Sequence, residues 1–124
     1  MRALILRPDR SAAVIELADG SEQATLSDLY RRIGCRSAEV VPLEQDVFMW
    51  LDEQGLLAAP MPTVNRPAIA LAAALGRAQY YVGIVVYTGG ADRRGHALGL
   101  SDERLGWLLA QLEQLGVDVA RPPR

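Results

Sequence analysis

The sequence contains no lysine, and its 124 residues include a single cysteine and a single histidine. All 13 basic residues are arginine, which we interpret as the coding bias of a GC-rich genome. Because Cys35 is alone, no intramolecular disulfide can form, and the chain does not have the pattern of a stapled secreted domain. One Cys and one His cannot supply the four ligands of a structural zinc site, so we expect no metal site.

Long apolar runs are also missing. The longest candidate, residues 68–75, is far shorter than the roughly 20 residues that cross a bilayer, and the chain does not start with a charged-then-apolar signal peptide. The net charge of −2 gives no general attraction to nucleic acid or to an anionic membrane. We therefore expect a cytoplasmic protein that contacts no membrane, and nucleic acid is disfavoured as a partner.

Residues 80–88 are the stretch around which the rest of the chain is organised. They are β-branched or aromatic, carry no charge and stop at Gly89 and Gly90. Apolar residues at consecutive positions indicate a strand covered on both faces, so we predict the central strand here, with Gly83 inside it. We expect Pro42 at an edge or strand end, because proline has no N–H to donate. The other predicted strands are residues 2–7, 11–17, 39–43, 46–51, 97–100 and 117–119.

Three segments have the features of helices. The first has apolar residues at i, i+3, i+4 and i+7 from Leu26, with Thr25 as its predicted cap and Gly34 at its end. The second follows Asn65 and is apolar almost all round, so we expect it to be buried on more than one side. The third begins at Ser101 and carries a stripe of leucines. Between the helices, Gly55 is expected to turn the chain with a positive φ.

The order of these segments predicts the architecture. Strands at hairpin spacing with three intervening helices are typical of an α+β domain. We predict one domain over residues 1–120, a single mainly antiparallel sheet with three helices packed on it, and a frayed tail at residues 121–124.

Several short motifs stand out along the chain. They are MRAL at the start, EVVPL at 39–43, DV leading to MW at 46–50, DEQGL at 52–56, Asn65 with Ala68, VG at 82–83, TG at 88–89 and GLSD at 99–102. Together they resemble a family of small proteins from actinobacteria, phages and mobile elements that is catalogued as a domain of unknown function. The resemblance implies a single domain and a mobile-element origin, and it supplies no catalytic residue.

The loop at residues 89–96 is the first candidate binding site. Its glycines, among them Gly89 and Gly90, free backbone amides to form an anion-binding concavity, and Arg93, Arg94 and His96 can add positive charge. The spacing does not match a phosphate-binding P-loop. The alternative interpretation is a mobile hairpin loop with solvated arginines.

The second candidate region combines acidic and aromatic residues. Asp46 precedes a strand in which Phe48 and Trp50 share one face, so this segment is either a two-sided core strand or an aromatic and acidic surface for a basic partner protein. Trp107 lies near 200° on the third helix, on its polar side, when Leu105 is placed at zero. Because tryptophan is enriched in binding hot spots, Trp107 is either an exposed contact or is covered by the C-terminal tail.

Two functional hypotheses follow from these observations. The first is a non-enzymatic interaction or regulatory protein, a homodimer that acts through an apolar surface including Trp107. The second is a small-anion or nucleotide-binding module that uses the loop at residues 89–96. An enzyme ranks behind both, because we identify no catalytic residues, and we expect no cofactor.

Overall fold

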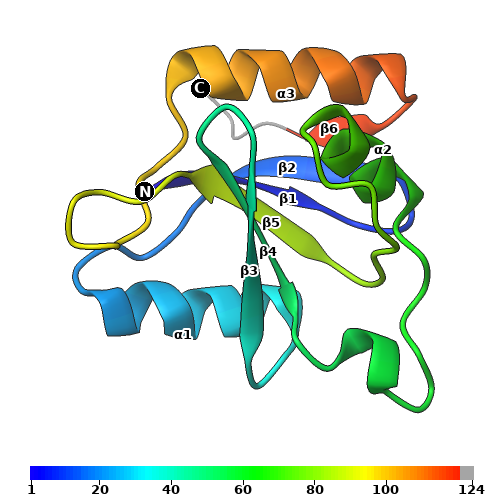
Figure 1. The fold of residues 1–124 in the computed structure, drawn as a ribbon, viewed down its shortest axis with the longest axis horizontal. Helices are drawn as coiled ribbons and strands as arrows, with labels where there is room; N and C mark the ends of the chain where they lie inside the picture. The colour runs from blue at the N-terminus through cyan, green and yellow to red at the C-terminus, as the bar shows by residue number, and fades with distance from the viewer. Residues whose placement is uncertain (121–124) are drawn as a thin grey trace.

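We describe a computed structural model of the protein over residues 1–120 (Figure 1). Within these residues the chain forms six strands, three α-helices and one 3-10 turn. Their order is β1 (Arg2–Leu6), β2 (Ser11–Glu16), α1 (Glu22–Ile33), β3 (Ala38–Leu43), β4 (Val47–Asp52), η1 (Gly55–Leu57), α2 (Arg66–Ala74), β5 (Val85–Gly89), α3 (Asp102–Gln114) and β6 (Asp118–Ala120). The predicted α+β fold is confirmed. The tail predicted at residues 121–124 lies outside the described residues.

The strands form one sheet in the order β3-β4-β5-β1-β2-β6. Every pairing is antiparallel except that between β2 and β6, so the sheet is mainly antiparallel, as predicted. Strand β5 lies between β4 and β1 in the middle of the sheet, which confirms its central position. Pro42 lies in the edge strand β3, where its missing N–H interrupts no ladder in the middle of the sheet.

The helices cover the two faces of the sheet unequally. Helix α1 packs on one face, whereas α2 and α3 pack on the other (Figure 1). Alternate residues of each strand divide between two apolar cores: in β1, Leu4 and Leu6 belong to the larger core with α2 and α3. Ala3 and Ile5 belong to the smaller core with α1. The alternation follows from the two-residue period of a strand.

The prediction of a strand over residues 80–84 is wrong. The strand begins only at Val85, and before it Val82 forms an isolated bridge with Val64. Gly83 has a φ of 76°, a left-handed conformation that does not occur in a regular strand. Tyr81 and Val82 are nevertheless buried. Their apolar character thus reflects core packing and not strand pairing.

The first helix begins earlier than predicted. Ser21, and not Thr25, is its cap, because the Ser21 hydroxyl accepts a hydrogen bond from the Ala24 N–H at 3.0 Å. Thr25 lies in the first turn and donates its hydroxyl to the Ala18 carbonyl at 2.7 Å. The other helix signals are confirmed: Gly34 ends α1 in the left-handed conformation, and Asn65 and Ser101 cap α2 and α3.

Three smaller expectations also change. Gly55 does not turn the chain with a positive φ but starts the 3-10 turn η1. The strand expected at residues 97–100 is reduced to a single bridge between Ala97 and Ala91. The helix after Asn65 was expected to be buried on more than one side. Within this chain α2 buries one face and leaves Ala73 and Ala74 exposed, because its outer residues are small alanines that need little cover.

Candidate functional site

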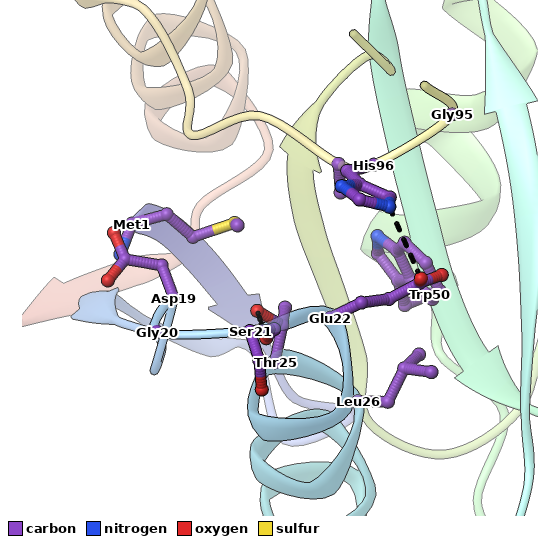
Figure 2. Close-up of a pocket in the computed structure, with 11 residues that line it drawn as sticks. Met1, Asp19, Gly20, Ser21, Glu22, Thr25, Leu26, Trp50, Gly95 and His96 are labelled. Atoms are coloured by element: carbon purple, nitrogen blue, oxygen red, sulfur yellow. Dashed lines mark hydrogen bonds and ion pairs between the residues drawn. The ribbon is translucent and has the colours of Figure 1, made fainter.

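The candidate site is a cavity of about 450 Å³ at the N-terminal end of α1. It lies on the face of the sheet that carries α1, between that helix, Trp50 of β4 and the loop that contains His96. Figure 2 shows Met1 and Asp19 on one side of the cavity, with His96 and Trp50 on the opposite side. Segments far apart in the sequence therefore build the site.

Trp50 is held in a fixed orientation. Strand β4 turns Val47, Met49 and Leu51 into the larger core. Phe48 and Trp50 share the other face, as predicted from the two-residue period, and this face is the one that carries α1. The indole N–H of Trp50 donates to the Thr88 hydroxyl at 2.9 Å, and that hydroxyl donates to the Gly89 carbonyl at 3.0 Å. The half-buried ring thereby forms a rigid aromatic wall of the cavity.

Charged groups surround the opening of the cavity. His96 Nε2 lies 3.3 Å from Glu22 Oε2 (Figure 2), and both side chains are substantially exposed. The Met1 amino group donates to the Leu17 carbonyl at 2.6 Å and to Asp19 at 3.1 Å. These contacts place carboxylates on both sides of the opening.

The loop predicted to bind an anion is organised by its own carboxylate. Asp92 Oδ1 accepts hydrogen bonds from the His96 N–H at 3.0 Å and the Arg94 N–H at 2.8 Å. These two bonds, that from His96 first, hold the pKa of Asp92 below its ordinary value. Two backbone amides of this loop, those of Arg94 and His96, are therefore already occupied by a carboxylate of the chain itself.

The five residues predicted for this loop do not line one common cavity. Gly89 is buried at the end of β5, and Gly90 packs beside Asp46. Arg93 and Arg94 are exposed, and of the five only His96 lines the cavity.

The residues predicted to bind a partner lie on different faces. Phe48 and Trp50 lie on the α1 side of the sheet, and Asp46 is exposed in the turn before them. Trp107 is half-buried and packs against the larger core on the opposite side of the sheet. These residues therefore do not form one surface.

An exposed apolar surface that the sequence analysis missed lies near the other end of α1. We define the apolar loop surface as Leu56, Leu57, Met61 and Tyr80, whose exposed fractions are 55%, 80%, 47% and 53%. A small hollow of about 80 Å³ brings Leu56 and Tyr80 together with the acidic residues Glu39, Asp52 and Glu53. The signal in the sequence was a run of apolar residues, LLAAPMP at 56–62, inside a proline-rich connection.

Several residues that carry the family resemblance have structural roles. Asn65 is fully buried: it caps α2 at the Ala68 N–H and donates to the carbonyls of Leu6 and Gly83 at 3.2 and 2.9 Å. A Cβ at Gly89 would lie 2.6 Å from the Gly99 carbonyl oxygen, so the two backbones pass too closely for a side chain. These motifs thus specify the fold.

The described residues contain neither a cluster of metal ligands nor a helix that could span a membrane. Between Met1 and Ala120, no three His, Cys, Asp or Glu side chains are grouped as metal ligands would be. Burial, and then the Asp52 carboxylate, raises the pKa of the half-buried Cys35 thiol, which keeps it protonated. None of the helices in this part of the chain has the length and apolar character needed to cross a membrane.

The sequence matches a known protein family. The model of the family described as Domain of unknown function (DUF3846) matches residues 1–113, which is nearly the whole chain. No curated protein and no solved structure matches the chain.

Proposed function

Since the chain belongs to the DUF3846 family, whose description names no activity, we propose a function from its own surface: it is a non-enzymatic interaction protein. Its contact site is the apolar loop surface, and its partner is a protein segment that carries apolar and basic side chains.

The observation that carries this proposal is the exposure of four large apolar side chains on adjacent segments. A single exposed leucine is common in folded proteins, but several large apolar side chains exposed on neighbouring segments are typical of an interaction site. Leu56 and Tyr80 line the same hollow, and Leu57 and Met61 follow Leu56 closely in the chain. Leu57 is 80% exposed and lies in a turn that projects away from the sheet (Figure 1). The apolar surface predicted from the sequence is therefore proposed here, at η1, and not at Trp107.

The acidic residues around the apolar loop surface favour a basic partner. Glu39, Asp52 and Glu53 border the surface, and no basic residue occurs between Arg36 and Arg66. Arg77 precedes Tyr80 and is the base closest to it in the sequence. An acidic border attracts a basic partner and repels an acidic one.

A second copy of the chain is a less suitable occupant. In a symmetric dimer the same patch faces itself, so each acidic border would lie near its own copy. Such juxtaposed like charges oppose association unless they are separated or paired. The homodimer predicted from the sequence is thus the alternative to a basic partner at this surface.

The proposal can be tested with two synthetic amphipathic peptides. One contains leucine and arginine, and the other replaces each arginine with glutamate. We expect the arginine peptide to bind about tenfold more tightly in fluorescence anisotropy, because only its charge complements the border. The double variant Leu57→Ser with Met61→Ser should weaken this binding about tenfold.

The matched control is Leu98→Ser. Leu98 is 49% exposed but lies outside the apolar loop surface, so its replacement should leave peptide binding unchanged. Equal binding of both peptides would contradict the proposal, as would full binding by the double variant. A dimer in light scattering that the double variant dissociates would make a second copy the occupant, and would also overturn it.

Binding of a small anion or nucleotide to the loop at residues 89–96 stays a prediction, and the amides occupied by Asp92 weigh against it. A cytoplasmic location and a phage or mobile-element origin likewise stay predictions.

A further inference from the structure

We propose that the cavity at the N-terminal end of α1 binds a small organic cation: a protonated amine carried on a flat apolar body. This site is separate from the apolar loop surface, because the two lie near opposite ends of α1 (Figure 1).

The size and walls of the cavity suit a small organic molecule. Its volume of about 450 Å³ lies within the range of roughly 300–1,000 Å³ that is typical of small-ligand sites. The apolar part of the cavity wall is formed by Leu26, Ala97 and the Trp50 ring. The hydrogen bond from Trp50 to Thr88 fixes the ring in advance, so a ligand loses little free energy in ordering it.

The charges at the opening favour a cation. Three carboxylates are present there: Glu22 and Asp19 line the cavity, and Glu16 lies 3.5 Å from the Met1 amino group. The Met1 amino group is the one fixed positive charge among the lining groups, and it is already paired with Asp19 and Glu16. Even if His96 is counted as a cation, the three carboxylates outnumber the two positive groups, so the local charge is negative.

The positive N-terminal end of α1 does not cancel the negative charge at the opening of the cavity. An α-helix N-terminus carries a partial positive charge of about one half, which on its own would favour an anion. In α1 the Ser21 hydroxyl already caps the Ala24 N–H, and Glu22 lies in the first turn. A carboxylate and a cap of the chain itself thus compensate the positive end.

Glu22 and Trp50 provide the two contacts that recognise an ammonium group. Glu22 lines the cavity with its Oε2 3.3 Å from His96 Nε2, and a carboxylate can accept several hydrogen bonds at once. Tryptophan is the aromatic side chain that attracts a cation most strongly. A protonated amine between them would gain both interactions.

The test uses benzylamine, which is a cation at neutral pH, and benzyl alcohol, which has the same ring without the charge. Binding is followed by NMR through the Trp50 indole N–H and the backbone amides. We expect benzylamine to shift the signals of Trp50 and the first turn of α1, and to bind about tenfold more tightly than benzyl alcohol. Glu22→Gln should weaken benzylamine binding by a similar factor and leave benzyl alcohol unaffected.

The matched control is Glu113→Gln. It removes the same charge from an exposed position on α3, on the opposite side of the sheet, and should not change binding. Equal affinities for the two probes, an unchanged affinity in Glu22→Gln, or shifts confined to other surfaces would each overturn the proposal. Tighter binding of adenosine monophosphate than of benzylamine at the same signals would overturn it in favour of an anion.

Discussion

At the scale of single residues, the Tyr87 hydroxyl is an isolated polar group in the core. The side chain is fully buried in β5, and the hydroxyl has no hydrogen-bond partner within residues 1–120. Burial, and to a smaller degree the neighbouring Tyr81, raises the pKa of Tyr87 far above the ordinary value, so the group stays neutral. The fold has therefore desolvated this hydroxyl without replacing its bonds to water.

Replacing Tyr87 with phenylalanine should leave the free energy of unfolding unchanged or raise it by about 1 kcal/mol, because the unpaired hydroxyl is removed and the ring remains. Tyr81→Phe is the control. Its hydroxyl donates to the Arg77 carbonyl at 3.0 Å, so that variant should lose about 1 kcal/mol. Urea unfolding measures both, and a clear loss of stability in Tyr87→Phe would show that the hydroxyl does have a partner.

Residues whose roles are local could be predicted from the sequence, whereas those fixed by distant contacts could not. Asn65 and Ser101 were identified as caps because the signal lies within a few residues of each helix start. Gly83 was misplaced because its left-handed conformation accompanies two contacts made across the fold. Its N–H donates to Thr63 and its carbonyl accepts from Asn65.

At the scale of elements, α1 is tied to the preceding chain by Asp28. This carboxylate is nearly buried and accepts hydrogen bonds from the Ala18 N–H and from Arg31 and Arg32. Burial alone would raise the pKa of Asp28, but the Ala18 hydrogen bond and the two arginines together lower it below its ordinary value. A lowered pKa means that the ionised form stabilises the folded state.

We therefore expect Asp28→Asn to reduce the free energy of unfolding at pH 7 by about 1–2 kcal/mol. The contribution is fully present above about pH 4, near the unfolded pKa, and is lost as the pH falls through the lower pKa of the folded state. The difference between wild type and variant should shrink accordingly in urea unfolding from pH 7 to pH 3. Asp118→Asn, at an exposed carboxylate of β6, should change stability little at any pH, and a pH-independent loss in Asp28→Asn would contradict this account.

Elements with a clear period were predicted well, and those defined only by apolar content were not. The alternation in β4 correctly predicted that Phe48 and Trp50 share one face of the strand. The run at residues 80–84 has no such alternation, and core packing of Tyr81 and Val82 produces the same composition as a buried strand.

At the scale of the whole molecule, the cation site could not be predicted because the fold assembles it. Its lining comes from Met1, residues 19–26, Trp50 and residues 95–97. Trp50 and His96 were each singled out from the sequence, but for different sites. Only the pairing of β4 with β5, and the packing of α1 on that face, brings them to one cavity.

The unequal division of the core has a consequence for how the molecule opens. Helix α1 is held by the smaller apolar cluster, whereas α2 and α3 share the larger one. Regions with fewer buried contacts open more often, so the backbone amides of α1 should exchange their hydrogens with solvent before those of β1 and β5. A molecule bound in the cavity would contact both α1 and the sheet, so its binding should slow the amide hydrogen exchange of that helix.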